Sequence, residues 1–341
     1  SGINLGAFFG GIVCVYLGKY HSWNLCFLAA AIVMIIGLVT FYFTKKHLGP
    51  IGDSPLKEMT TQKRTIREVA VYVGSLLAIP LIYIMVNNTR YTDIFMYTIG
   101  PIAIVYFLYE VYKVGSVSLQ KKLMVAFSFI LFYVFFNAFF EQSGGSLNLF
   151  AANNLHHNLF GIPMDPNFIN NSSNSLFVII FSPLLGLLWL AMYKRKIEPN
   201  TVIKFGIGFL FLSLAFYVFY YTKFFADENG ITSLNIFTLA YVIITIVELC
   251  IGPIGMSIIT KLSPKPMFGM MMGLWFLASA YGQYAAGLLG ADMSLEGNAT
   301  LMMKLQSYCE GYKQLAIYAL ICGVALIVIS PLIRKWMGDV K

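Results

Sequence analysis

Residues 23–43 have the sequence WNLCFLAAAIVMIIGLVTFYF, an apolar run without one charged side chain. A helix needs about 20 predominantly apolar residues to cross the roughly 30 Å hydrocarbon core of a bilayer, so this run can span a membrane. Ten candidate segments of this kind cover residues 3–17, 23–43, 69–86, 94–111, 123–140, 176–192, 202–220, 236–262, 267–289 and 315–333. Because these segments lack the period-two alternation of barrel strands, we predict that they form helices.

The composition supports a membrane protein. Hydrophobic residues make up 58% of the 341 residues and charged residues only 11%, whereas about 25% of a typical soluble domain is charged. The net charge is +8, but Lys and Arg occur in short clusters between apolar runs rather than on one water-facing surface. This pattern argues against a nucleic-acid partner. We predict an all-α polytopic membrane protein with the lipid bilayer as its main solvent.

The positive charges also predict the orientation of the chain. Threading the ten segments alternately through a membrane places 18 of the 23 Lys and Arg residues on one side. Cytoplasmic loops carry such an excess of positive charge. We therefore expect a multi-pass protein of the inner (plasma) membrane with a cytoplasmic carboxy terminus, and an outer loop at 143–174, which contains neither Lys nor Arg.

No metal or disulfide site is indicated by the sequence. The five cysteines form no C-x-x-C pair, and Cys309 falls in a segment that we predict to be a polar loop. His156 and His157 are adjacent in the predicted outer loop, where solvated histidines are commoner than metal ligands. Motifs for phosphate binding or nucleophilic catalysis are absent.

Glu248 is the sharpest functional candidate in the apolar segments. Counting back from Lys261 at 1.5 Å per residue places Glu248 roughly 20 Å from the cytoplasmic end, near mid-bilayer. An ionisable group there costs several kcal/mol and is a candidate for ligand or proton binding. The alternative is a protonated carboxyl that is hydrogen-bonded to a neighbouring helix.

Glu141 and Trp275 are two further candidates. Glu141 lies nearly a full crossing after Lys122. Either its helix ends there, which puts Glu141 at the outer rim, or the helix continues through residues 146–152. Trp275 is too deep in its segment for an interfacial aromatic belt, so we expect its ring to line a cavity.

Four motifs resemble those of proton-dependent oligopeptide transporters. FNAFFEQSGGSLNLF at 136–150 is similar to the seventh-helix signature of that family. ELCIGPIGMS at 248–257 looks like the tenth helix, and GMMMGLWFLA at 269–278 looks like the eleventh. GINLGA at 2–7 resembles the end of the fifth-helix motif. The motifs occur in the family's order and cover nearly the whole chain.

The resemblance implies a major facilitator superfamily helix bundle. Such proteins have twelve membrane helices in two halves, and many bacterial members insert a two-helix hairpin between the halves. Residues 1–43 would then be helices five and six of the amino-terminal half, and 44–68 a cytoplasmic linker. Residues 69–113 would be the hairpin, and 114–341 the carboxy-terminal six-helix bundle. Helices one to four, with the family's E-x-x-E-R motif, would precede Ser1.

The resemblance also implies a function and site residues. It implies a symporter that imports di- and tripeptides with protons by alternating access, and that needs a proton gradient but no cofactor. Glu248 would bind the peptide amino terminus, with Asn174 assisting. Asn4 would hold the ligand from the amino-terminal half, Trp275 would line a side-chain pocket, and Glu141 would take part in proton coupling and gating. We expect a monomer.

Three alternatives remain open at this point. A carrier of another solute, such as nitrate or an amino acid, could use the same scaffold. A passive channel would need no proton gradient. An integral membrane enzyme is disfavoured because the two membrane acids lie on different segments without a histidine at ligand spacing.

Overall fold

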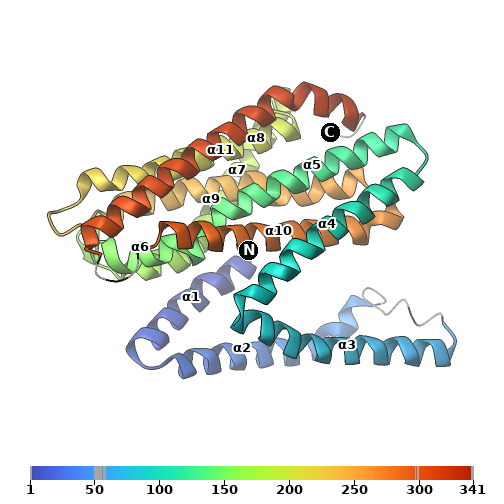
Figure 1. Cartoon of the computed structure of the whole chain (residues 1–341), viewed down its shortest axis with the longest axis horizontal. Coiled ribbons are helices and arrows are strands. Elements are labelled where there is room, and N and C mark those ends of the chain that lie inside the picture. The colour runs from blue at the N-terminus through green and yellow to red at the C-terminus, as the bar shows by residue number, and fades with distance from the viewer. Residues whose placement is uncertain (1, 50–55, 57–58, 296, 298, 339–341) are drawn as a thin grey trace. The chain divides into compact units, whose positions relative to one another are not determined.

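The computed structural model describes residues 2–49, 56, 59–295, 297 and 299–338 (Figure 1). Nearly all of this chain is helical. In chain order the helices are α1 (Gly2–Tyr20), α2 (Trp23–Thr44), α3 (Thr61–Asn87), α4 (Thr89–Lys113), α5 (Val117–Phe140), α6 (Ser146–Asn154), α7 (Pro166–Lys194), α8 (Thr201–Tyr221), α9 (Leu234–Leu262), α10 (Phe268–Met293) and α11 (Leu301–Met337). The strands β1 (Asn158–Leu159) and β2 (Ile162–Pro163) form a small antiparallel hairpin between α6 and α7.

The predicted membrane segments all fall on long helices. Among the described residues, nine helical stretches are long and apolar enough to cross a bilayer. The segment predicted at 267–289 falls almost entirely on α10, which has 26 residues but is not one of those nine. The prediction of an all-α polytopic membrane protein is therefore confirmed.

The chain divides into two compact units. One unit comprises Ser1–Cys26 and Val111–Lys341, and the other comprises Phe27–Glu110. In the second unit, α3 has no buried residue, and large apolar side chains such as Leu76 are exposed. A helix with apolar side chains all round suits a lipid environment. The predicted domain boundaries stay predictions, and residues 50–55 and 57–58 of the expected linker lie outside the described residues.

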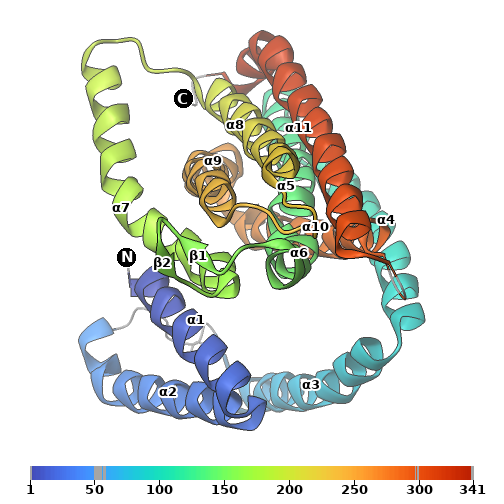
Figure 2. The ribbon, with the colours of Figure 1, turned by 90° about the vertical axis from the view of Figure 1, so that its left-hand side faces the viewer.

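The first unit is held together by close helix packing. Figure 2 looks nearly along α9, with α5, α7, α8 and α10 placed around it. Glycines permit the closest approach: a Cβ on Gly206 of α8 would lie 3.2 Å from the carbonyl oxygen of Gly323 on α11. Part of this core is aromatic: Phe219 of α8 contacts Phe237 and Tyr241 of α9. This packing fixes the helices that carry the candidate site.

The last helix is longer than predicted. The sequence predicts a polar loop around Cys309, but α11 begins at Leu301 and Cys309 is completely buried within it. One side of this extension is polar, with Glu310 bound to Lys223 at 2.8 Å. A search for continuous apolar runs misses an amphipathic helical stretch of this kind, which is why the loop prediction was wrong.

Candidate functional site

Glu248 and Asn174 meet where α9 packs against α7. Asn174 donates its Nδ2–H to Glu248 Oε2 at 3.0 Å and lies 3.3 Å from Thr245 Oγ1. Thr245 is completely buried, whereas Glu248 and Asn174 are half-buried. The Glu248 carboxyl thus lies in a polar seam between two helices. This is the environment expected of a membrane carboxyl that binds a ligand or a proton.

The sequence left open whether the helix ends at Glu141 or continues through residues 146–152, and the backbone in the structure has features of both. Helix α5 ends at Phe140, and the Glu141 N–H donates to the Asn137 carbonyl. A 3₁₀ turn, η3 (Glu141–Gly144), follows, and helical backbone resumes in α6. Glu141 is half-buried, and Gln283 of α10 lies 3.5 Å from its Oε1. Glu141 is therefore at a break in the helix and is not fully solvated.

The fold brings the two acids to the same cavity. Glu141 lines it, and so does Asn174, which donates to the Glu248 carboxyl. The sequence places the two acids on different segments, and the packing of α5, α7 and α9 gathers them around one site.

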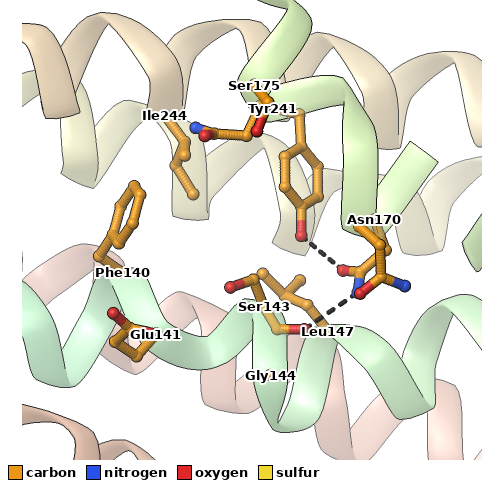
Figure 3. Close-up of a pocket in the computed structure, with 11 residues that line it drawn as sticks. Phe140, Glu141, Ser143, Gly144, Leu147, Asn170, Ser175, Tyr241 and Ile244 are labelled. Carbon is orange, nitrogen blue, oxygen red and sulfur yellow. Dashed lines mark hydrogen bonds between the residues drawn. The ribbon is translucent and has the colours of Figure 1, made fainter. Parts of the chain in front are cut away.

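A cavity of about 220 Å³ opens beside these residues (Figure 3). Its walls come from the end of α5, η3 and α6 on one side and from α7 and α9 on the other. The lining residues are Phe140, Glu141, Ser143, Gly144, Leu147, Asn170, Asn171, Asn174, Ser175, Tyr241 and Ile244. Small-molecule sites usually measure about 300–1,000 Å³, so this cavity can enclose only part of such a ligand.

Hydrogen bonds fix the wall of the cavity at Asn170. Tyr241 donates its hydroxyl to Asn170 Oδ1 at 2.5 Å, and Asn170 Nδ2 donates to the Ser143 carbonyl at 3.0 Å (Figure 3). Tyr241 and Asn170 are both buried. These two bonds join α9, α7 and η3 at the wall of the cavity.

Trp275 is buried in an aromatic stack. Only 2% of it is exposed, and its ring lies 3.6 Å from that of Tyr133 with an interplanar angle of 15°. Gly255 of α9 leaves room for the indole, because a Cβ there would overlap it. Trp275 is not among the lining residues of the cavity described above. Its predicted contact with a substrate side chain stays a prediction.

Asn4 lies on α1, which packs against α7 in antiparallel fashion. Gly11 faces the Asn171 backbone and Ser172, and Lys19 forms an ion pair with Asp165 at 2.6 Å. Within the described residues the Asn4 side chain makes no hydrogen bond and does not line the cavity. Its predicted role stays a prediction.

Sequence reasoning missed Asn170, Asn171 and Tyr241. The outer loop was predicted to extend to residue 174, but α7 begins at Pro166, and Asp165 caps it by accepting from the Asn167 N–H at 2.9 Å. The available signal was an acidic N-cap followed by proline, which is typical of a helix start. The described residues contain no cluster of three or more His, Cys, Asp or Glu side chains that could hold a metal ion.

Comparison with known proteins gives a consistent result. A family model described as "POT family" matches residues 1–303. The "Peptide transporter YePEPT" of Yersinia enterocolitica is 29% identical over 355 residues, which cover all of this chain and 68% of that protein. The "Dipeptide and tripeptide permease A" of Cronobacter turicensis is 28% identical and matches 99% of this chain and 66% of its own length.

Comparison with solved structures also finds similarity to peptide transporters. The crystal structure of a peptide transporter POT in complex with sulfate superposes with a TM-score of 0.78 at 26% identity. The superposition covers 98% of this chain and 67% of that one. The chain thus spans about two thirds of the length of these relatives.

Proposed function

The chain belongs to the POT family, and we propose that the protein imports di- and tripeptides together with protons across the inner membrane. The proposal is supported by the names of its relatives, which are peptide transporters and dipeptide and tripeptide permeases. In the proposed mechanism the two halves of the protein rock around a central site, so that the site faces each side of the membrane in turn.

The observation that carries the proposal is the Asn174–Glu248 pair at the edge of the cavity. A peptide is charged at both ends, and removing its ammonium group from water is costly unless it meets a partner. The Glu248 carboxylate supplies the opposite charge. Asn174 holds one carboxyl oxygen with its Nδ2, so the carboxylate is oriented before the ligand arrives.

In symport the proton and the peptide cross together, so the transported proton is carried by a group other than the carboxylate that holds the ammonium group. A proton on Glu248 would neutralise the carboxylate and remove its attraction for the ammonium group. Glu141 is half-buried and lines the same cavity, so it can carry the proton while Glu248 holds the peptide. We assign Glu141 to proton coupling and gating on this basis and on the family resemblance. The proton gradient is the energy source, and no cofactor is required.

The remaining assignments rest on the family resemblance. Trp275 would contact a substrate side chain, and Asn4 would hold the ligand from the amino-terminal half. The protein would act as a monomer, with its carboxy terminus in the cytoplasm because the predicted threading places most Lys and Arg residues there.

Uptake by the full-length protein in liposomes tests this function. Radiolabelled dialanine should accumulate when the outside is made acidic, and an uncoupler should abolish the accumulation. Glu248→Gln should lose uptake while remaining folded. The control, Glu310→Gln, changes an acid on α11 that pairs with Lys223 and does not line the cavity, and it should transport normally.

Other outcomes point to the rival functions. Normal uptake by Glu248→Gln would remove this residue from the site. Uptake that resists the uncoupler would indicate a passive channel. Competition by nitrate or free amino acids, but not by di- and tripeptides, would indicate a carrier of another solute.

A further inference from the structure

A row of asparagines follows one face of α7 along the cavity. Asn167 and Asn171, and likewise Asn170 and Asn174, are four residues apart, and the pairs 167/170 and 171/174 are three apart, which places all four on the same side of a helix. Three of them, Asn170, Asn171 and Asn174, line the cavity. A carboxamide offers one acceptor and one donor group, so the hydrogen bonds inside the protein decide which of these remains for a ligand.

Asn171 and Asn174 keep their acceptor oxygens free, whereas Asn170 does not. The Oδ1 of Asn170 accepts from Tyr241, and its Nδ2 donates to the Ser143 carbonyl. Asn171 donates its Nδ2 to the Asn167 carbonyl at 2.8 Å, and Asn174 donates its Nδ2 to Glu248. In the part of the chain that the structure describes, no group donates to Oδ1 of Asn171 or Asn174. Two acceptors one helical turn apart thus remain available to a ligand.

The spacing of these acceptors is close to the repeat of an extended peptide. Side chains at i and i+3 of a helix have Cβ atoms about 5–6 Å apart. An extended chain advances about 3.3 Å per residue and directs every second N–H to the same side, which gives roughly 6.6 Å between equivalent donors. The amino group of residue one and the amide N–H of residue three therefore match the two acceptors, given the reach of the side chains.

We propose that Asn171 accepts a hydrogen bond from the amide N–H of the third residue of a tripeptide whose amino terminus lies at Glu248 and Asn174. The inference rests on the proposed function, since it needs a peptide in the site. It assigns Asn171 a role in substrate length. A dipeptide has no third N–H and leaves Asn171 unused, so the same site accepts both lengths but binds the longer one with one additional contact.

Asn171→Ala tests the inference through the ratio of two substrates. One hydrogen bond of ordinary strength corresponds to about a 3- to 10-fold change in kcat/KM. We expect Asn171→Ala to lose this factor for trialanine and to change less than about twofold for dialanine. Asn153→Ala is the matched control: Asn153 also donates to the carbonyl four residues earlier, at 2.8 Å, but it does not line the cavity. It should leave both substrates unchanged.

A change to the substrate completes the test. Trialanine that is N-methylated at the third residue cannot donate from that amide. It should be transported about 3- to 10-fold less well than trialanine by the wild type. Asn171→Ala should show no such difference between the two peptides, because the contact is already missing.

The results separate this inference from the proposed function. Equal losses for dialanine and trialanine in Asn171→Ala, or a full cost of N-methylation in that variant, would overturn the role of Asn171 and leave peptide transport standing. Failure of the wild type to take up dialanine would refute the proposed function itself.

Discussion

Replacing Tyr241 by phenylalanine should destabilise the protein by about 1–2 kcal/mol. The substitution removes only the hydroxyl that donates to Asn170 Oδ1 at 2.5 Å. Asn170 is buried, with 4% exposed, and would be left with an unsatisfied acceptor. Such a loss costs about 1–3 kcal/mol in soluble proteins, whereas interhelical hydrogen bonds in a membrane protein average about 0.6 and reach about 1.7 kcal/mol. We expect a cost near the upper end of the range for membrane proteins, because the Tyr241–Asn170 bond belongs to a network that joins α9, α7 and η3.

The assay is reversible unfolding in mixed micelles, with Tyr312→Phe as the matched control. Tyr312 is also completely buried. Its hydroxyl lies near Ser146 but makes no hydrogen bond of normal length within the described residues. Removing it should therefore be neutral or slightly stabilising. Equal free energies of unfolding for Tyr241→Phe and Tyr312→Phe would refute the idea that the Asn170 network supports the cavity wall.

Two further predictions concern helix packing and the N-terminal cap of α7. A Cβ at Gly282 of α10 would overlap Asn137 and lie 2.9 Å from a backbone oxygen of α5, so Gly282→Ala should cost about 1–3 kcal/mol. Gly287→Ala on the same helix meets no atom within 4 Å and should be neutral or stabilising in the same unfolding assay; equal effects would contradict the packing argument. Asp165→Asn loses the ion pair with Lys19 but keeps a capping oxygen and should cost under about 1 kcal/mol. Asp165→Ala also loses the cap and should cost about 1 kcal/mol more in thermal unfolding, and equal losses for both variants would contradict the capping role.

The helices could be predicted from the sequence because lipid imposes a simple constraint. A continuous apolar run such as residues 23–43 satisfies its backbone in lipid only as a helix, so length and composition suffice. The same reasoning failed at Cys309, where α11 continues as an amphipathic helix beyond the apolar run. There the decisive information is which side of the helix packs against the bundle.

The site was only partly accessible from the sequence. Glu248 stood out because a lone acid in an apolar segment has few explanations, and the structure places Asn174 beside it. The contributions of Tyr241, Asn170 and Asn171 depend on how α7 and α9 pack. Free acceptors on Asn171 and Asn174 follow from the direction of individual hydrogen bonds, which no spacing in the sequence reveals.

The most direct test of the account is whether Glu248 binds the ammonium group of the peptide. Binding of dialanine and of N-acetyl-dialanine to the full-length protein and to Glu248→Gln can be measured by isothermal titration calorimetry. Acetylation removes the positive charge, and a hydrogen bond to a charged group is worth about 1.5–3 kcal/mol. We predict that acetylation weakens binding to the wild type by about 10- to 100-fold and leaves binding to Glu248→Gln unchanged. Equal affinity of the wild type for the two peptides would contradict the central claim.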